Sequence, residues 1–469
     1  MAITGKIATE IIQRIPAAWA WEYKLVPYAE EDRVLCCYGS EGADWEELLP
    51  EFEVVTGELI RITPIASGEL VRMLNQYYRQ GAKARESGTF SASGDRFLMR
   101  LVGEAFHSYA SDIHFECYEE RCRIRFRLDG QLIERYVIEK QNYPAIVNQV
   151  KIMANLDISE KRLPQDGRIF YQSDNEKFDV RVSCLPTIYG EKVVLRLLTR
   201  HVELLELSNL GFSSKQLEDY TQAVQKPHGL VLISGPTGSG KSTTLYATLR
   251  MLNRETGNIL TIEDPVEYTL EGVNQVQLKE EIGLTFGSAL RTFLRQDPDI
   301  IMLGEIRDAD TAQMAIRSSL TGHLIFSTIH TNSAWGSVAR LVDMGAHPYL
   351  VSNTLILCVA QRLLRLLCPH CKETVPVDEE VRRTLDDTDT LKTHCRPTGC
   401  DQCYYTGYKG RKAIYEVIPM DKDLSEAVRT SQDEISQLLK ARGIVTLRES
   451  ALQLFRDGLT SLEELIPQI

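Results

Sequence analysis

The segment Gly235–Ser242 (GPTGSGKS) constrains the fold of this 469-residue chain more than any other. It fits the pattern GxxxxGK[ST] at every fixed position; the apolar run Gly229–Ser234 precedes it and a helical pattern follows it. Glycines let a loop curl so that its amides point at phosphate oxygens, and the following helix adds its positive N-terminal end. The segment therefore predicts a strand, a phosphate-binding loop and a helix in succession.

We expect this loop and the start of the helix to bind a nucleoside triphosphate. Lys241 is placed to bridge the β- and γ-phosphates, and the Ser242 hydroxyl is placed to ligate Mg²⁺. The predicted nucleotide-binding residues are Gly235, Pro236, Thr237, Gly238, Ser239, Gly240, Lys241, Ser242 and Thr243.

Apolar strands alternate with helical segments around the loop. The stretches NILTIEDP, PDIIMLGE and GHLIFSTIH each predict one strand. This alternation predicts an α/β fold with a mostly parallel sheet. Ligands of such sheets bind at the carboxyl ends of the strands, so residues that follow each strand are the candidates for chemistry.

Acidic residues follow two of these strands. Glu305 follows Ile300–Leu303 and is suited to polarise the attacking water or to bind a Mg²⁺-bound water. Gly304 stands where an acidic Mg²⁺ ligand is usual, so we expect Ser242 and water molecules to be the main ligands of the metal. The second segment, Thr261–Tyr268 (TIEDPVEY), crowds three carboxylates together, which favours a cation site or a general base.

Two histidines bracket the apolar strand in Thr321–Ala334 (TGHLIFSTIHTNSA). His330 lies at its carboxyl end, where ligands bind, and is the predicted sensor of the γ-phosphate. His323 lies at the other end, and the sequence leaves open whether it is functional or structural.

Two CxxC pairs dominate the spacing of the eleven cysteines. CPHC and CDQC are separated by 28 residues, and two such knuckles form the four-thiolate tetrahedral site that zinc favours. The predicted zinc ligands are Cys368, Cys371, Cys400 and Cys403, with His370, His394 and Cys395 as nearby alternatives.

Charge and apolar pattern narrow the class of protein further. The chain has 53 basic and 65 acidic residues and a net charge of -12. General nucleic-acid binding needs a basic face, so we expect no nucleic-acid partner. No apolar run reaches the length of about 18 residues that suggests a membrane-spanning helix, and polar residues interrupt any signal-peptide core, so we expect a cytoplasmic protein.

Changes in pattern divide the chain into parts. Small and polar residues dominate Gln80–Gly94, which predicts a linker, and strict alternation in Arg121–Leu132 predicts a half-buried strand. The predicted parts are an N-terminal module (1–85), an α+β domain (95–200) and the nucleotide-binding domain (205–469), which includes a zinc module (366–412) and a helical C-terminal part (413–469).

Together these motifs resemble the secretion ATPase superfamily, which includes the type II secretion ATPases and the type IV pilus assembly ATPases. LRQDPDIIMLGEIRD resembles its Walker B signature, TIEDPVE its Asp box and GHLIFSTIHTNSA its His box. ASDIHFE, RFRLDG, RLPQDGR and VRVSCLPT resemble its second N-terminal domain. The likeness covers about 95–469, whereas residues 1–85 match only loosely.

The resemblance implies a RecA-like domain after a PAS-like α+β domain, with ATP between the two domains in a homohexamer. It implies that Glu267 and Glu305 are the leading acids for hydrolysis, and which of them is the base stays open. It also implies phosphate-sensing arginines, which transfer to Arg181 and Arg196. Arg196 interrupts the apolar run VVLRLL, where a buried charge would need a partner such as phosphate. Arg291 and Arg295 are further candidates of this kind.

The implied protein is a motor that uses ATP, Mg²⁺ and Zn²⁺ to power assembly of a type II pseudopilus or a type IV pilus. Its implied partners are an inner-membrane platform protein and, through residues 1–85, the cytoplasmic domain of a membrane protein, so that it is peripheral to the inner membrane. One alternative is a DNA-handling or conjugation-type RecA-like motor, which the net charge and the cysteine module disfavour. Another is a non-hydrolysing scaffold, which the acids disfavour.

Overall fold

A computed structural model describes the chain in two compact units. One contains 1–197, 368–372 and 397–407, and the other contains 198–367, 373–396 and 408–469. After residue 94, the described residues are 95–173, 177–198, 206–377, 379–385, 391–430 and 435–468. Before it, they are 7, 9–12, 14–15, 17–31, 34–41, 43, 45, 59–67, 70, 73–74 and 77–78. The predicted linker at 80–94 lies outside the described residues.

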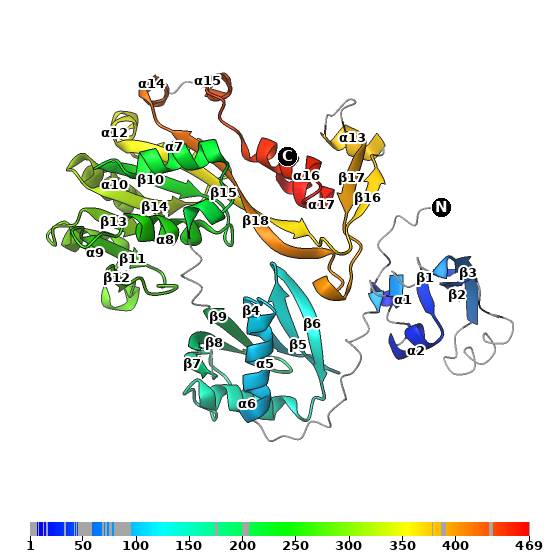
Figure 1. The fold of residues 1–469 in the computed structure, drawn as a ribbon. Coiled ribbons are helices and arrows are strands. Elements are labelled where there is room, and N and C mark those ends of the chain that lie inside the picture. Colours follow the sequence, from blue (N-terminus) through cyan, green and yellow to red (C-terminus); the bar gives the residue numbers. More distant parts are fainter. Residues whose placement is uncertain are drawn as a thin grey trace. The chain divides into compact units, whose positions relative to one another are not determined.

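The N-terminal module is a small mixed structure around one three-stranded sheet (Figure 1). Strand β1 (Leu25–Glu31) pairs antiparallel with β2 (Val34–Ser40), which pairs parallel with β3 (Leu59–Ile65). Helices α1 (Thr9–Ile12) and α2 (Ala17–Glu22) precede the sheet. Apolar side chains of strands and helices form a core of their own.

The second N-terminal domain is an α+β structure with a six-stranded sheet in the order β6-β5-β4-β9-β8-β7. Alternation along Cys122–Leu128 buries every second side chain and turns Arg123, Arg125 and Arg127 away from the core, as the sequence predicts. Its elements are α5 (Asp95–His107), β4 (Asp112–Cys117), β5 (Cys122–Leu128), β6 (Gln131–Ile138), α6 (Tyr143–Met153), β7 (Gln165–Gln172), β8 (Lys177–Thr187) and β9 (Gly190–Leu198).

The nucleotide-binding domain contains a seven-stranded sheet in the order β12-β11-β13-β14-β10-β15-β18. All neighbouring pairs are parallel except β15 and β18, so the predicted parallel α/β sheet is confirmed. The strands are β10 (Gly229–Ser234), β11 (Ile259–Glu263), β12 (Asn274–Gln277), β13 (Ile300–Leu303), β14 (Leu324–Ile329), β15 (Leu355–Leu367) and β18 (Tyr408–Pro419).

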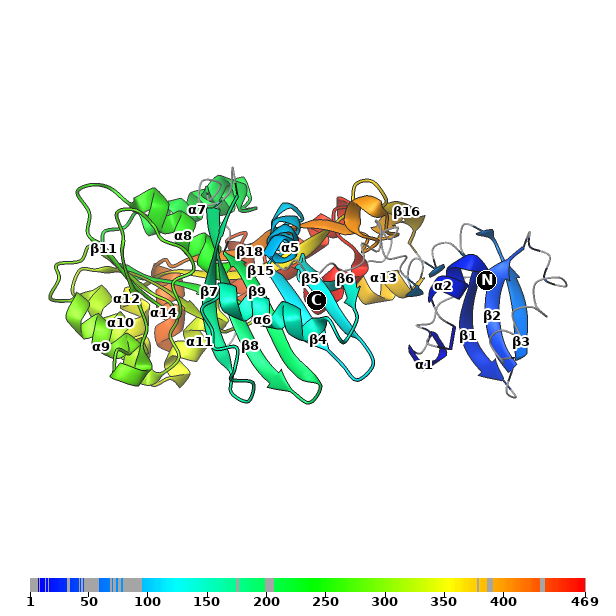
Figure 2. The same cartoon turned by 90° about the horizontal axis from the view of Figure 1, so that it is seen from below.

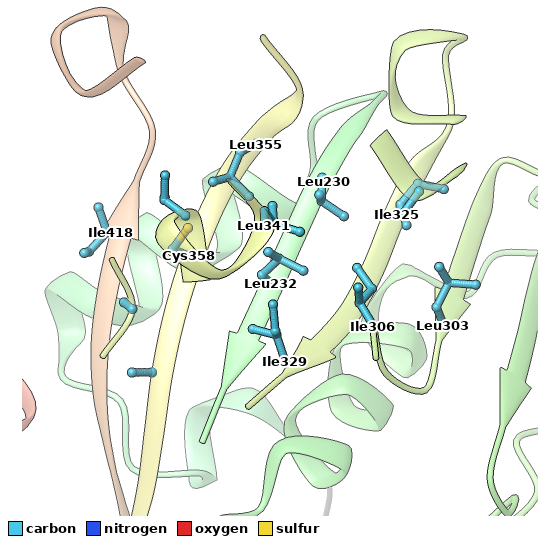
Figure 3. Packing of buried hydrophobic residues seen from close by; sticks show 14 of the residues in the cluster. Leu230, Leu232, Leu303, Ile306, Ile325, Ile329, Leu341, Leu355, Cys358 and Ile418 are labelled. Atoms are coloured by element: carbon cyan, nitrogen blue, oxygen red, sulfur yellow. The ribbon is translucent and has the colours of Figure 1, made fainter. Parts of the chain in front are cut away.

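Helices cover both faces of this sheet (Figure 2). Buried side chains of α7 (Ser214–Val224) and α8 (Lys241–Leu252) form a core on one face. The other face is covered by α9 (Phe286–Phe293), α10 (Ala309–Leu320), α11 (Gly336–Asp343) and α12 (Pro348–Thr354). Figure 3 shows Leu230, Leu232 and Ile325 of the central strands in this second core. Because the central strands are buried on both faces, their sequences are continuous apolar runs.

The prediction of a helical C-terminal part over 413–469 is wrong at its beginning. Strand β18 continues to Pro419 and pairs with β15 over most of its length. Its run Ala413–Ile418 is fully buried, which hides the alternation that would have marked a strand. Helices then follow: α14 (Lys422–Thr430), α15 (Ile435–Ala441), α16 (Leu447–Arg456) and α17 (Leu462–Leu465).

Between β15 and β18 lie two short antiparallel strands, β16 (Glu373–Pro376) and β17 (Thr393–Arg396), and helix α13 (Glu379–Leu385). The CxxC loops on either side of them belong to the first compact unit, although the sequence places them inside the nucleotide-binding domain. Short 3-10 helices occupy Leu207–Asn209, Glu280–Ile282, Asp401–Cys403 and Ile466–Gln468. Every helix in the described part of the chain is too short or too polar to span a bilayer.

Candidate active site and cysteine cluster

The phosphate-binding loop connects β10 to α8 and packs against β15. Gly240 precedes α8 with a φ of 90°, which glycine adopts without strain. A Cβ atom on Gly240 would lie 2.8 Å from the side-chain nitrogen of Gln361, and one on Gly235 would lie 2.5 Å from the Gln361 carbonyl oxygen. The loop therefore requires glycine at both positions, for conformation and for space.

Lys241 is the first residue of α8, and its side chain turns back over the loop. Its Nζ donates hydrogen bonds to the carbonyl oxygens of Gly235 at 2.8 Å and Pro236 at 3.0 Å. Burial lowers the pKa of Lys241 and the neighbouring Arg362 adds to this effect, whereas Glu305 opposes it. In the same loop the buried Ser239 Oγ has no hydrogen-bond partner among the described residues. A half-buried ammonium and an unpaired hydroxyl suit an anionic ligand such as phosphate.

Glu305, Arg307, His330 and Asp264 form a polar cluster at the carboxyl ends of β11, β13 and β14. His330 Nε2 lies 3.2 Å from Glu305 Oε2, and Arg307 pairs with Glu305 and, at 3.4 Å, with Asp264. Burial would raise the pKa of the Glu305 carboxyl, but Arg307 and His330 hold it below its ordinary value. The cluster thus keeps an ionised carboxylate at the edge where ligands of parallel sheets bind.

The three carboxylates of the Asp box do not gather at one cation site, so of the two alternatives only the general base stays a prediction. The Glu263 side chain is buried, and its oxygens accept hydrogen bonds from Thr261 at 2.6 Å, Gln275 at 3.1 Å and the Tyr246 hydroxyl. Asp264 pairs with Arg307 instead. Glu267 is only partly buried and lies in the loop after β11. Glu263 therefore belongs to the core, Asp264 joins the cluster around Glu305, and Glu267 stays a predicted acid of the site.

The structure separates the two histidines that flank β14. His330 lies beside Glu305, whereas His323 Nδ1 lies 3.0 Å from the Ser318 carbonyl oxygen and 3.2 Å from Thr321 Oγ1. These partners belong to the end of α10 and the turn that follows it. His323 thus has local structural contacts at the amino end of β14, opposite to the loop.

Arg181 and Arg196 lie on the neighbouring strands β8 and β9 and point away from the core of their sheet. The Arg196 side chain is 59% exposed and pairs with Asp112 at 2.9 Å. The prediction that Arg196 is a buried charge is therefore wrong. An arginine on the polar face of a half-buried strand interrupts the apolar run without entering the core.

Arg291 and Arg295 occupy the exposed side of α9 and the residues after it. Arg291 lies against the sulfur of Met314 at 3.8 Å, and Arg295 donates to the Arg291 carbonyl oxygen at 3.0 Å. Among the described residues, these contacts do not bring either arginine to the phosphate-binding loop.

Two residues of β15 that belong to none of the sequence motifs adjoin the loop. Gln361 is buried, and its Oε1 accepts a hydrogen bond from Thr244 of α8 at 2.9 Å. Arg362 donates to the carbonyl oxygens of its neighbour Gln361 at 3.0 Å and of Asn332 at 3.1 Å. The signal was present, because this polar pair interrupts the apolar stretch LILCVAQRLL.

The four predicted cysteines form one cluster. All four Sγ atoms lie within 4.8 Å of one another, and individual pairs lie 3.9, 3.7 and 3.8 Å apart. Tetrahedral ligands at about 2.3 Å from zinc lie about 3.8 Å from each other, so the cluster fits this ion. Burial would raise the pKa of Cys403, but the backbone N–H groups of Cys400 and Gly407 hold it below its ordinary value.

Two of the three alternative ligands have other contacts. The Cys395 sulfur lies 3.6 Å from Thr374 Oγ1 within the β16–β17 pair, and the His394 ring stacks on Phe455 with centroids 5.5 Å apart. Within the described part of the chain, these four cysteines are the one group of cysteine, histidine and acidic residues arranged to hold a metal ion.

The sheet order, the glycine-rich loop and the acids at the carboxyl ends define a RecA-like P-loop ATPase. Solved structures agree on the fold. The Legionella pneumophila ATPase DotB has a TM-score of 0.59 at 21% identity over 79% of this chain and 95% of its own. The pilus retraction motor PilT with bound ADP has a TM-score of 0.57 at 24% identity over 79% of this chain and 96% of its own.

The family described as Type II/IV secretion system protein matches residues 90–467, and the MshEN domain matches 4–84. The type II secretion system ATPase E of Vibrio cholerae is 39% identical over 97% of this chain and 96% of its own. The type IV pilus assembly ATPase PilB of Myxococcus xanthus is 47% identical over 80% of this chain and 68% of its own. The chain belongs to the Type II/IV secretion system protein family and is an ATP-hydrolysing enzyme. The resemblance to the secretion ATPases is confirmed, and the N-terminal module matches a separate family, the MshEN domain.

Proposed function

We propose that this protein is the motor of a type II secretion or type IV pilus assembly system. In this proposal it is a cytoplasmic homohexamer, peripheral to the inner membrane, that passes the movement of its domains to an integral platform protein. The observation that carries the proposal is the ionised Glu305, held beside His330 and Arg307 at the edge that carries the phosphate-binding loop. The names and identities of the relatives support the choice of system.

The chain's own residues divide the work of hydrolysis. The loop amides and Lys241 bind the phosphates, and Ser242 would hold Mg²⁺, which neutralises phosphate charge when bound. Glu305 or Glu267 orients and deprotonates the attacking water, since a carboxylate at this edge can accept its proton. His330 lies 3.2 Å from Glu305 and is placed to contact both this carboxylate and the γ-phosphate. Arg307 keeps Glu305 ionised.

Arg181 and Arg196 are proposed to complete the site when the two units close on the nucleotide. Both lie on the side of their sheet that faces away from its core, and Arg196 is largely exposed. A guanidinium offers several donors in one plane and suits phosphate oxygens. Closure that depends on bound nucleotide would couple hydrolysis to movement of the domains.

The structural metal of the proposal is Zn²⁺. It would be held by Cys368, Cys371, Cys400 and Cys403.

ATP turnover of the full-length protein tests the motor proposal. We expect turnover to rise when purified platform protein in lipid vesicles is added and to be unchanged by plasmid DNA. Empty vesicles are the control for the lipid surface alone. Turnover stimulated by DNA and unaffected by the platform protein would support the alternative, a DNA-handling or conjugation-type motor.

A further inference from the structure

A buried hydrogen-bond cluster lies beneath the Asp box and is centred on Glu263. This carboxylate is 4% exposed at the end of β11. One oxygen accepts from Thr261 Oγ1 at 2.6 Å and Gln275 Nε2 at 3.1 Å, and the other accepts from the Tyr246 hydroxyl. The cluster thus joins three elements of the nucleotide-binding domain: α8, β11 and β12.

The cluster also holds the loop that carries Glu267. The backbone N–H of Glu267 donates to the Tyr246 hydroxyl oxygen at 3.2 Å. Further along the loop, Gln275 donates to the Tyr268 carbonyl oxygen at 3.1 Å and accepts from the Leu270 N–H at 2.7 Å. Both ends of the segment 267–270 are therefore tied to residues that bind Glu263.

The direction of the Tyr246 hydroxyl follows from its partners. Its one proton is donated to the Glu263 carboxyl oxygen. The hydroxyl oxygen therefore presents its lone pairs to the Glu267 N–H. Tyr246 also lies on α8, the helix that begins at Lys241. One rigid helix thus carries both the phosphate-binding lysine and the anchor of the Glu267 backbone.

We propose that Tyr246 and Glu263 are positioning residues that set Glu267 at its working distance from the phosphates. Neither touches the reacting atoms in this proposal. They act through the backbone of Glu267, so the inference rests on the proposed catalytic role of that residue. A displacement of about 1 Å can lower a rate about a hundredfold, so loss of one buried hydroxyl that holds Glu267 can lower the rate of hydrolysis.

The test is Tyr246→Phe in the full-length protein, because this change keeps the ring and removes both hydrogen bonds. Tyr268→Phe is the matched control. Its ring packs against Tyr246 with centroids 4.2 Å apart, and its buried hydroxyl has no hydrogen-bond partner among the described residues. We expect Tyr246→Phe to lower kcat about tenfold or more with little change in KM for ATP, and Tyr268→Phe to keep kcat within about twofold.

Amide hydrogen exchange provides a readout that does not depend on turnover. The Glu267 N–H should exchange faster in Tyr246→Phe and at the parent rate in Tyr268→Phe. Parent-like kcat and exchange in Tyr246→Phe would overturn the inference. Equal losses in both variants would overturn it too, because they would point to ring packing. Glu267→Gln tests the premise separately. Parent-like turnover of Glu267→Gln would refute the catalytic role of Glu267. If Glu267→Gln loses turnover while Tyr246→Phe stays active, only the positioning role of Tyr246 and Glu263 is refuted.

Discussion

Glu305→Gln should separate catalysis from stability in this protein. The change keeps the volume of the side chain and removes its charge. If Glu305 is the base or orients the attacking water, turnover should fall about 100-fold or more, which is about 2.7 kcal/mol of barrier. Binding of ATP should persist, because in the proposed mechanism the loop and Lys241 bind the phosphates and Glu305 acts on the attacking water.

The structure predicts a small cost in stability for the same change. Arg307 loses one partner but keeps Asp264 at 3.4 Å, and its side chain is 51% exposed. An ion pair with so exposed a partner contributes about 1 kcal/mol or less to the free energy of unfolding, so the melting temperature should shift by only a few degrees. A hundredfold loss of turnover therefore cannot come from unfolding.

Steady-state phosphate release, binding of a fluorescent ATP analogue and thermal melting would be measured together. Glu464→Gln is the control, because Glu464 pairs with the less exposed Arg365 at 2.6 Å. We expect this control to lose more stability than Glu305→Gln and to keep its turnover. Parent-like turnover of Glu305→Gln, or a loss that tracks melting in both variants, would refute the role of Glu305.

The dependence of turnover on pH tests the same residue. Because the folded-state pKa of Glu305 lies below its ordinary value of 4.5, its ionised form gives stability that is fully present above that value. This contribution is lost as the pH falls through the lower folded-state pKa. We therefore expect no loss of turnover attributable to Glu305 between about pH 7 and pH 5. An acid limb in that range that Glu305→Gln abolishes would contradict the assignment.

Three further predictions concern the loop, the metal and the assembly. Lys241→Ala should abolish turnover and weaken ATP binding, because the lost contact to phosphate is charge-assisted; parent-like rates would remove the loop assignment. Metal analysis of protein purified without chelator should find about one zinc per chain, and Cys371→Ser should lower zinc content and solubility. Absence of zinc from the parent protein would refute the site. Arg196→Ala should lower turnover, and parent activity per chain should rise with protein concentration as oligomers form; a neutral variant together with concentration-independent activity would refute the interdomain mechanism.

Local sequence was sufficient for the features that depend on neighbouring residues. The loop at Gly235–Ser242 was predictable because its glycines, lysine and flanking strand are contiguous. The cysteine cluster was predictable because each CxxC knuckle brings two thiolates together by itself. Only their pairing is non-local, and the structure confirms it with all four sulfurs within 4.8 Å.

Predictions failed where the surroundings of a side chain decide its role. The apolar residues around Arg196 predict a buried side chain, but one face of a half-buried strand is open to solvent. Its place in TIEDPVEY predicts that Glu263 acts with its acidic neighbours, but the strand turns its side chain into the core. The apolar pattern at the end of β18 predicts a helix, but its side chains are buried on both sides of a strand.

The sequence by itself determined the class of fold, the phosphate-binding loop and the set of acids and thiolates that can do chemistry, because spacing along the chain sets these. Only the tertiary structure decided which acids face the site and which hold it. Glu305 meets Arg307 and His330, Glu263 meets Tyr246, and Gln361 supports the loop from a distant strand. Such contacts depend on strands that are far apart in sequence and adjacent in the sheet, and no local pattern records that adjacency.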